Sequence, residues 1–159
     1  MTTDAAKSWG VAPLEILKSM SGLEFLTAIR DGRLPAPPIS RGLAFRMTEV
    51  EQGRVVFEGF PSADHYNPIG TVHGGYAATL LDSCMACAVQ STLPKGTGYT
   101  TLEFKVNLVR AITVETGRVL AEGRVMTAGR RIGTAEGRLL DPAGKLLAHA
   151  TTTCLIMEL

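Results

Sequence analysis

Residues 75–91 constrain the fold of this 159-residue chain most strongly, because they predict a helix that is apolar on nearly every face. The apolar positions are Ala77, Ala78, Leu80, Leu81, Met85, Ala86, Ala88 and Val89. A helix with this pattern is expected to be buried on all sides. Asp82 lies in its middle, and an ionised carboxylate is normally buried only when it is paired, hydrogen-bonded or functional. Asp82 is therefore a candidate catalytic residue, with a structural ion pair or a solvent-facing position as the alternatives.

A glycine-rich turn, residues 67–75 (NPIGTVHGG), leads into this helix. The first turn of a helix exposes backbone N–H groups that have no partner within the helix and that attract anions or polarised carbonyl oxygens. Gly74 and Gly75 would allow a ligand to approach this backbone closely. The turn therefore predicts that backbone N–H groups at the helix start form a second part of the active site, in addition to Asp82.

Asp82 follows Gly74 by eight residues, which corresponds to about 12 Å along a helix axis. One helix cannot bring both groups to the same substrate atom. A two-fold dimer with antiparallel copies of this helix would place Asp82 of one chain beside the His73-Gly74 turn of the other. We therefore predict an active site that is shared between subunits.

The rest of the chain predicts one α+β domain over residues 1–159. Residues 1–39 form an N-terminal extension: apolar residues repeat at helical spacing over 12–31, Ser21-Gly22 marks a kink or break, and prolines make 35–38 a stiff extended connector. Six antiparallel strands are expected to wrap the central helix. Their predicted ranges are 42–50, 54–60, 98–109, 114–127, 131–140 and 145–157.

Alternation in the strand at 98–109 predicts that one of its faces is covered by the central helix. Leu102, Phe104, Val106 and Leu108 alternate there with Thr101, Glu103, Lys105 and Asn107. On this pattern Leu102 belongs to the core.

Composition narrows the function. The net charge of +1 gives no sign of nucleic-acid binding, and no apolar stretch reaches the roughly 20 residues of a membrane span. The three cysteines include Cys84 and Cys87 in a C-x-x-C within the helix, whereas a structural zinc normally needs four ligands. We expect reduced, packed thiols, no metal and a cytoplasmic protein without a leader.

The order of these elements, with Asn67, His73, Gly74, Gly75 and Asp82 at their spacing, resembles the hotdog-fold acyl-CoA thioesterases of the phenylacetate-pathway type. The resemblance covers roughly residues 40–157. It implies hydrolysis of an acyl-CoA thioester to a carboxylic acid and coenzyme A, in a homodimer or a homotetramer of two dimers. Coenzyme A is then part of the substrate, and no separate cofactor is implied.

The same resemblance implies roles for single residues. Asp82 would be the nucleophile or a general base, and the backbone N–H of Gly74 would polarise the thioester carbonyl. Asn67 would hydrogen-bond the attacking water or the acyl carbonyl, or it is an ordinary turn residue. His73 would orient the turn; the alternatives are a plain capping or loop residue and direct proton transfer by its side chain.

In these families a serine or threonine on the strand after the helix faces the acid. Thr100 and Thr101 both fit, and alternation favours Thr101, although a plain strand threonine is equally compatible. Three arginines at strand ends or turns, Arg110, Arg130 and Arg131, would meet the phosphates of coenzyme A unless they are simply solvated.

Two other functions remain open. An acyl hydratase or dehydratase would use a histidine placed for proton abstraction. A non-catalytic acyl-CoA binding module would result if Asp82 were held in a salt bridge, because a fold does not fix a function.

Overall fold

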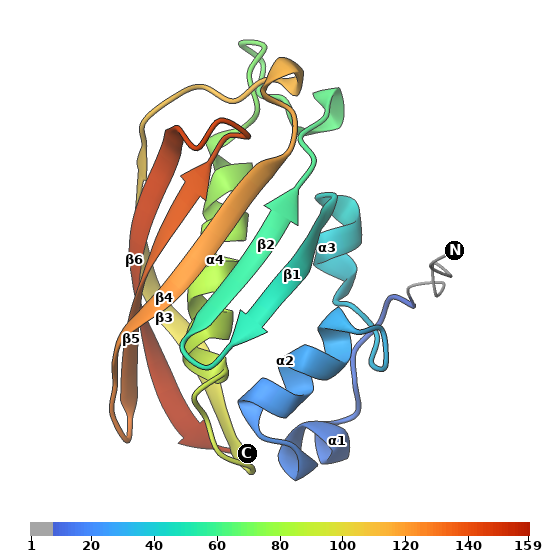
Figure 1. Cartoon of the computed structure of the whole chain (residues 1–159), viewed down its shortest axis with the longest axis vertical. Coiled ribbons are helices and arrows are strands. Elements are labelled where there is room, and N and C mark those ends of the chain that lie inside the picture. Colours follow the sequence, from blue (N-terminus) through green and yellow to red (C-terminus); the bar gives the residue numbers. More distant parts are fainter. Residues whose placement is uncertain (1–7) are drawn as a thin grey trace.

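The computed structural model describes residues 8–159 and places the long helix α4 (Gly74–Gln90) along the inner face of a curved six-stranded antiparallel sheet (Figure 1). The strand order is β1-β2-β4-β5-β6-β3. The strands are β1 (Phe45–Glu51), β2 (Arg54–Gly59), β3 (Thr97–Leu108), β4 (Val119–Ala128), β5 (Ile132–Leu140) and β6 (Leu146–Glu158). The predicted α+β architecture of about six strands around one helix is confirmed.

Helix α4 is buried because its side chains fill the inside of the sheet. Leu80, Leu81, Cys84 and Met85 are fully buried in the hydrophobic core. Glycine allows the closest approach between the layers: a Cβ on Gly123 of β4 would lie 2.3 Å from the backbone of Cys84. The sheet can therefore wrap the helix tightly.

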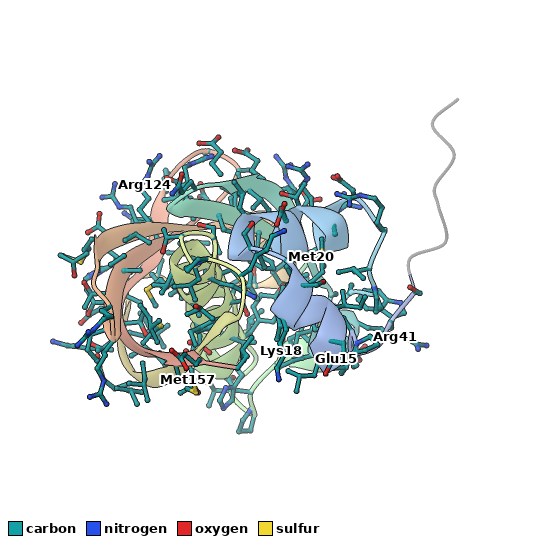
Figure 2. All side chains as sticks on the ribbon, turned by 90° about the horizontal axis from the view of Figure 1, so that it is seen from below. Glu15, Lys18, Met20, Arg41, Arg124 and Met157 are labelled. Atoms are coloured by element: carbon teal, nitrogen blue, oxygen red, sulfur yellow. The ribbon has the colours of Figure 1, made fainter. Side chains whose placement is uncertain are left out.

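The N-terminal segment forms two helices, α1 (Leu14–Ser19) and α2 (Gly22–Arg30), with the predicted break between them. Ser21 caps α2, because its Oγ accepts a hydrogen bond from the Glu24 N–H while the Glu24 carboxylate accepts one from the Ser21 N–H. Viewed from below, α4 lies between the sheet and these N-terminal helices (Figure 2). The helices close the side of the molecule that the sheet leaves open.

Two predicted boundaries were wrong for reasons of local geometry. The connector is extended only through Pro37, because Pro38 begins the short helix α3 (Pro38–Gly42), where its missing N–H costs nothing. The first strand consequently starts at Phe45 rather than at residue 42. Similarly, residues 114–116 form a 3₁₀ turn, so that β4 starts at Val119 rather than at residue 114.

The predicted cover of β3 by α4 is only partial. Tyr99 and Val106 pack against the core, and Thr101 hydrogen-bonds Asp82 of α4, but other apolar side chains stay exposed. Phe104 and Leu108 lie opposite buried residues of β6 and so share their face, yet they are 41% and 59% exposed. Leu102, which we expected in the core, is 55% exposed beside an irregularity in the pairing between Thr101 and Glu103. Strand β3 is an edge strand, and the start of α4 meets Leu108 at Gly74 without burying it.

No helix within residues 8–159 combines the length and apolar character that crossing a membrane requires.

Candidate active site

Asp82 and Thr101 meet between α4 and β3. Thr101 Oγ1 donates a hydrogen bond to Asp82 Oδ1 over 3.0 Å, and the carboxylate is half-buried. The neighbouring Thr100 is exposed. The structure thus brings Thr101, and not Thr100, to the acid. Alternation placed Thr101 on the face opposite the core, but the irregularity between Thr101 and Glu103 puts Thr101 and Phe104 on the same face.

Burial dominates the electrostatics of this carboxyl group. Removal from water raises the pKa of Asp82 above its ordinary value, and the hydrogen bond from Thr101 opposes that rise by stabilising the charged form. A carboxylate with a raised pKa is a better base than an exposed one while it stays ionised near neutral pH. The pair is therefore suited to accept a proton or to attack a carbonyl carbon.

The glycine-rich turn presents the start of α4, as predicted. His73 is the N-cap, and its Nδ1 accepts a hydrogen bond of 2.8 Å from the Gly75 N–H. Gly74 is the first helical residue, so its own N–H has no acceptor within the helix. His73 thus orients the turn, and the Gly74 N–H is free of helical bonding.

Asn67 uses its side chain to hold the preceding loop. Its Oδ1 accepts hydrogen bonds from the N–H groups of Ile69 and Thr71, and its Nδ2 donates to Thr71 Oγ1 over 3.0 Å. The sequence left two roles open for Asn67, a hydrogen bond to the substrate or its water, or an ordinary turn residue. This geometry favours the turn residue. Its contribution to the site is the shape of the loop before His73.

The structure does not bring all the candidates to one place. Gly74 and Asp82 lie at the start and in the middle of the same helix. Arg110 binds the backbone of Leu147 at one end of β6, whereas Arg131 binds that of Ile156, nine residues away and about 30 Å along a strand. Arg130 is adjacent to Arg131. The three arginines therefore form no single cluster within one chain.

Sequence reasoning missed a cavity of about 350 Å³ that reaches Asp82 and Thr101. The N-terminal segment supplies much of its lining, and α4, β1, β2 and β3 supply the rest. Apolar spacing in α2 was the available signal, since a helix outside the motif region must bury its apolar face somewhere. We define this space as the N-terminal cavity.

The three cysteines are not paired with one another. Cys84 and Cys154 are buried, and burial raises the pKa of the Cys87 thiol to about 12. These thiols are therefore protonated at neutral pH and poor nucleophiles. Within residues 8–159, no group of three His, Cys, Asp or Glu side chains is arranged to hold a metal ion.

Comparisons with known proteins agree with this architecture. The family model described as "Thioesterase superfamily" matches residues 69–148. A solved structure from Ralstonia eutropha JMP134, named as a candidate thioesterase related to phenylacetic acid degradation, shares 27% identity with a TM-score of 0.75. The match covers 82% of this chain and 98% of that one. The conserved protein PA5202 from Pseudomonas aeruginosa shares 28% identity with a TM-score of 0.71, over 76% of this chain and 94% of that chain.

A curated relative, named as a candidate esterase of Halobacterium salinarum, is 36% identical over 84 residues. The match spans 52% of this chain and 54% of the relative, about half the length of each. The turn from Ile69 onward, the central helix and strands β3, β4 and β5 lie within the range of the family model, whereas Asn67 precedes it. The chain therefore belongs to the thioesterase superfamily and has its hotdog fold.

Proposed function

We propose that the protein hydrolyses acyl-CoA thioesters to a carboxylic acid and coenzyme A, with Asp82 as the reacting acid. One observation carries the proposal: a half-buried carboxylate, oriented by Thr101, faces a cavity in a member of the thioesterase superfamily. Relatives named as thioesterases and an esterase support a hydrolytic reaction. In this proposal Asp82 and the Gly74 N–H act on the substrate, Thr101 orients the acid, and His73 and Asn67 hold the shape of the turn before α4.

Asp82 can act by either of two routes. As a general base it takes a proton from water, the water oxygen bonds to the carbonyl carbon, and the C–S bond breaks to release the coenzyme A thiolate, which is then protonated. As a nucleophile its carboxylate oxygen forms the new bond, the C–S bond breaks, and water hydrolyses the resulting mixed anhydride. Both routes require the ionised acid.

The N–H of Gly74 polarises the carbonyl oxygen from the partner subunit in this proposal. The two groups of one chain are separated along α4, and a two-fold dimer supplies the missing half to each site. The exposed side chains of Phe104 and Leu108 on edge strand β3 offer an apolar surface for that dimer. Leu108 lies directly against Gly74. Assembly of two dimers into a tetramer stays a prediction from the family resemblance.

Coenzyme A is the implied partner as part of the substrate, and no separate cofactor or metal takes part in this proposal. Its phosphates would meet either Arg110 or the Arg130-Arg131 pair in one chain, because these lie near opposite ends of β6. A cytoplasmic location is proposed from the free thiols, which suit a reducing compartment.

Release of free thiol from a panel of acyl-CoAs tests the function. We expect turnover by the natural chain and a loss of about a hundredfold or more in kcat for Asp82→Asn, with folding retained. Equal turnover by both proteins would remove Asp82 from the mechanism. Binding of every ester without turnover would indicate an acyl-CoA binding module instead.

Mixed dimers test the shared site. Asp82→Asn and Gly74→Pro each damage a different half, so co-expression should restore roughly a quarter of natural activity, because about half of the dimers are mixed and each has one intact site. Two inactive variants that stay inactive together would place both halves in one subunit.

A further inference from the structure

We propose that the N-terminal cavity is the acyl chamber of this protein and that residues 9–47 determine which acyl group it accepts. The inference rests on the proposed thioesterase function and goes beyond it, because these residues lie outside the part of the chain that the family model matches. The occupant we assign is an apolar acyl group of about ten non-hydrogen atoms, such as octanoyl or phenylacetyl.

One face of α4 forms the floor of the chamber. Asp82, Ala86 and Gln90 line it at intervals of four residues, a spacing that places them along one stripe of α4, and this stripe is about 12 Å long. Asp82 marks the reacting end. Ala86 leaves room in the middle, and the amide of the largely buried Gln90 marks the far end. A thioester whose carbonyl carbon lies at Asp82 can extend its acyl group along this stripe.

Helix α2 forms a wall. Phe25, Leu26 and Ile29 line the cavity at helical spacing, so one apolar face of α2 points into it. The start of α2 is fixed against the end of α4: the Gly22 N–H donates to the Leu93 carbonyl over 3.0 Å, and a Cβ on Gly22 would lie 1.7 Å from the Gln90 carbonyl oxygen. The wall is therefore held in position relative to the floor.

Trp9 completes the lining on the solvent side. Its segment pairs with the proline connector, since the Gly10 N–H donates to the Ala36 carbonyl and the Ala36 N–H donates to the Ser8 carbonyl, over 3.0 and 2.9 Å. The ring is 38% exposed while it lines the cavity. Trp9 is also the single tryptophan of the sequence, so its fluorescence reports on this chamber alone.

Size and polarity define the occupant. At about 30 Å³ for each water-sized group, the 350 Å³ cavity holds roughly ten non-hydrogen atoms. That is enough for the acyl group and too little for coenzyme A, which must stay outside. Most lining side chains are apolar, and Arg30 already pairs with Asp31. Each buried methylene should therefore raise kcat/KM by about fourfold up to the length of the chamber.

Three variants test the chamber through the ratio of kcat/KM for octanoyl-CoA to that for acetyl-CoA. Ala86→Leu fills the floor and should lower this ratio by at least about tenfold, since it removes the space of several methylenes. Ile29→Ala removes side-chain volume from the wall, which enlarges the cavity and should move the preference toward longer acyl groups. Leu23→Ala is the matched control, because Leu23 lies on the same helix, packs against the core and does not line the cavity. It should leave the ratio unchanged.

Trp9 fluorescence gives a readout that needs no turnover. Titration of the natural chain with octanoate, the product acid, should give a saturable spectral shift that Ala86→Leu abolishes and Leu23→Ala retains. Hydrolysis with an unchanged substrate ratio in all variants and no Trp9 response would overturn the chamber while leaving the thioesterase function intact. A saturable Trp9 response without hydrolysis of any ester would support the chamber and overturn the proposed function.

Discussion

Thr101 donates its hydroxyl hydrogen bond to Asp82 from strand β3, across 3.0 Å, to a carboxylate that helix α4 holds half-buried. Burial destabilises the charged form of this acid, and the hydroxyl stabilises it. The two residues together set the pH at which the acid is ionised. This relationship makes the pH dependence of activity the most direct measure of the site.

The first prediction concerns that dependence. Thr101→Ala removes the stabilising hydrogen bond, so the pKa of Asp82 should rise further and the acid limb of kcat/KM should move to higher pH. Thr101→Ser keeps a hydroxyl and should restore the natural profile. A Thr101→Ala protein with reduced activity but an unmoved acid limb would mean that Thr101 acts only in packing.

The second prediction is that Asp82→Asn stabilises the protein while it inactivates the site. The folded-state pKa of Asp82 is raised, so between the unfolded and folded pKa values the folded state binds more protons, and stability falls as pH rises through this window. Above the window the ionised acid destabilises the folded state, whereas asparagine carries no charge. Thermal melting at pH 7 should show a higher Tm for Asp82→Asn, by a few °C, roughly what 1 kcal/mol produces at this size.

The advantage of Asp82→Asn should shrink as pH falls toward the ordinary pKa of an aspartate, where the natural side chain is also neutral. A Tm difference that stays constant down to that pH would show that packing, and not charge, accounts for it.

The third prediction separates the N–H of Gly74 from its lack of a side chain. Proline is tolerated at the first position of a helix and lacks the N–H, and the extended backbone of His73 (φ −57°, ψ 136°) suits a residue that precedes proline. Gly74→Pro should lower kcat by about 10²–10³, the usual cost of one oxyanion donor.

Gly74→Ala is the control, because its Cβ meets the same flexible end of Leu108, 2.6 Å away, while the N–H remains. Comparable losses of kcat in the proline and alanine variants would assign the effect to that contact.

The fourth prediction concerns the close packing of α2 against the end of α4. Gly22→Ala places a methyl group against the Gln90 carbonyl oxygen, so α2 must shift, at a cost of about 1–3 kcal/mol in the free energy of unfolding. Denaturant unfolding measures this cost. Gly42→Ala on α3 meets no atom within 4 Å and should be nearly neutral. Equal stabilities of the two variants would mean that the close approach of Gly22 is not needed.

The sequence predicted those features that depend on local pattern. Uniform apolarity located α4 to within a residue at each end. Alternation selected Thr101 over Thr100 but put it on the wrong face, because the irregularity between Thr101 and Glu103 leaves no mark in the pattern. Alternation predicted a covered Leu108, which is instead exposed. An alternating pattern shows that one face of a strand is apolar, but it does not show whether the same chain covers that face. The N-terminal cavity joins Trp9 to Thr101 through the tertiary fold, and no local spacing encodes that meeting.

The N-terminal cavity also separates two functions along the chain: the N-terminal segment selects the acyl group, and the later residues carry the chemistry. The proposed reacting acid and the helix start lie within residues 69–148, whereas Trp9, α2 and the proline connector precede them and carry no group of the proposed chemistry. Changes in the early segment can thus retune substrate preference without touching the hydrolytic machinery. Exchange of residues 9–47 between related chains would then transfer the acyl preference as one unit.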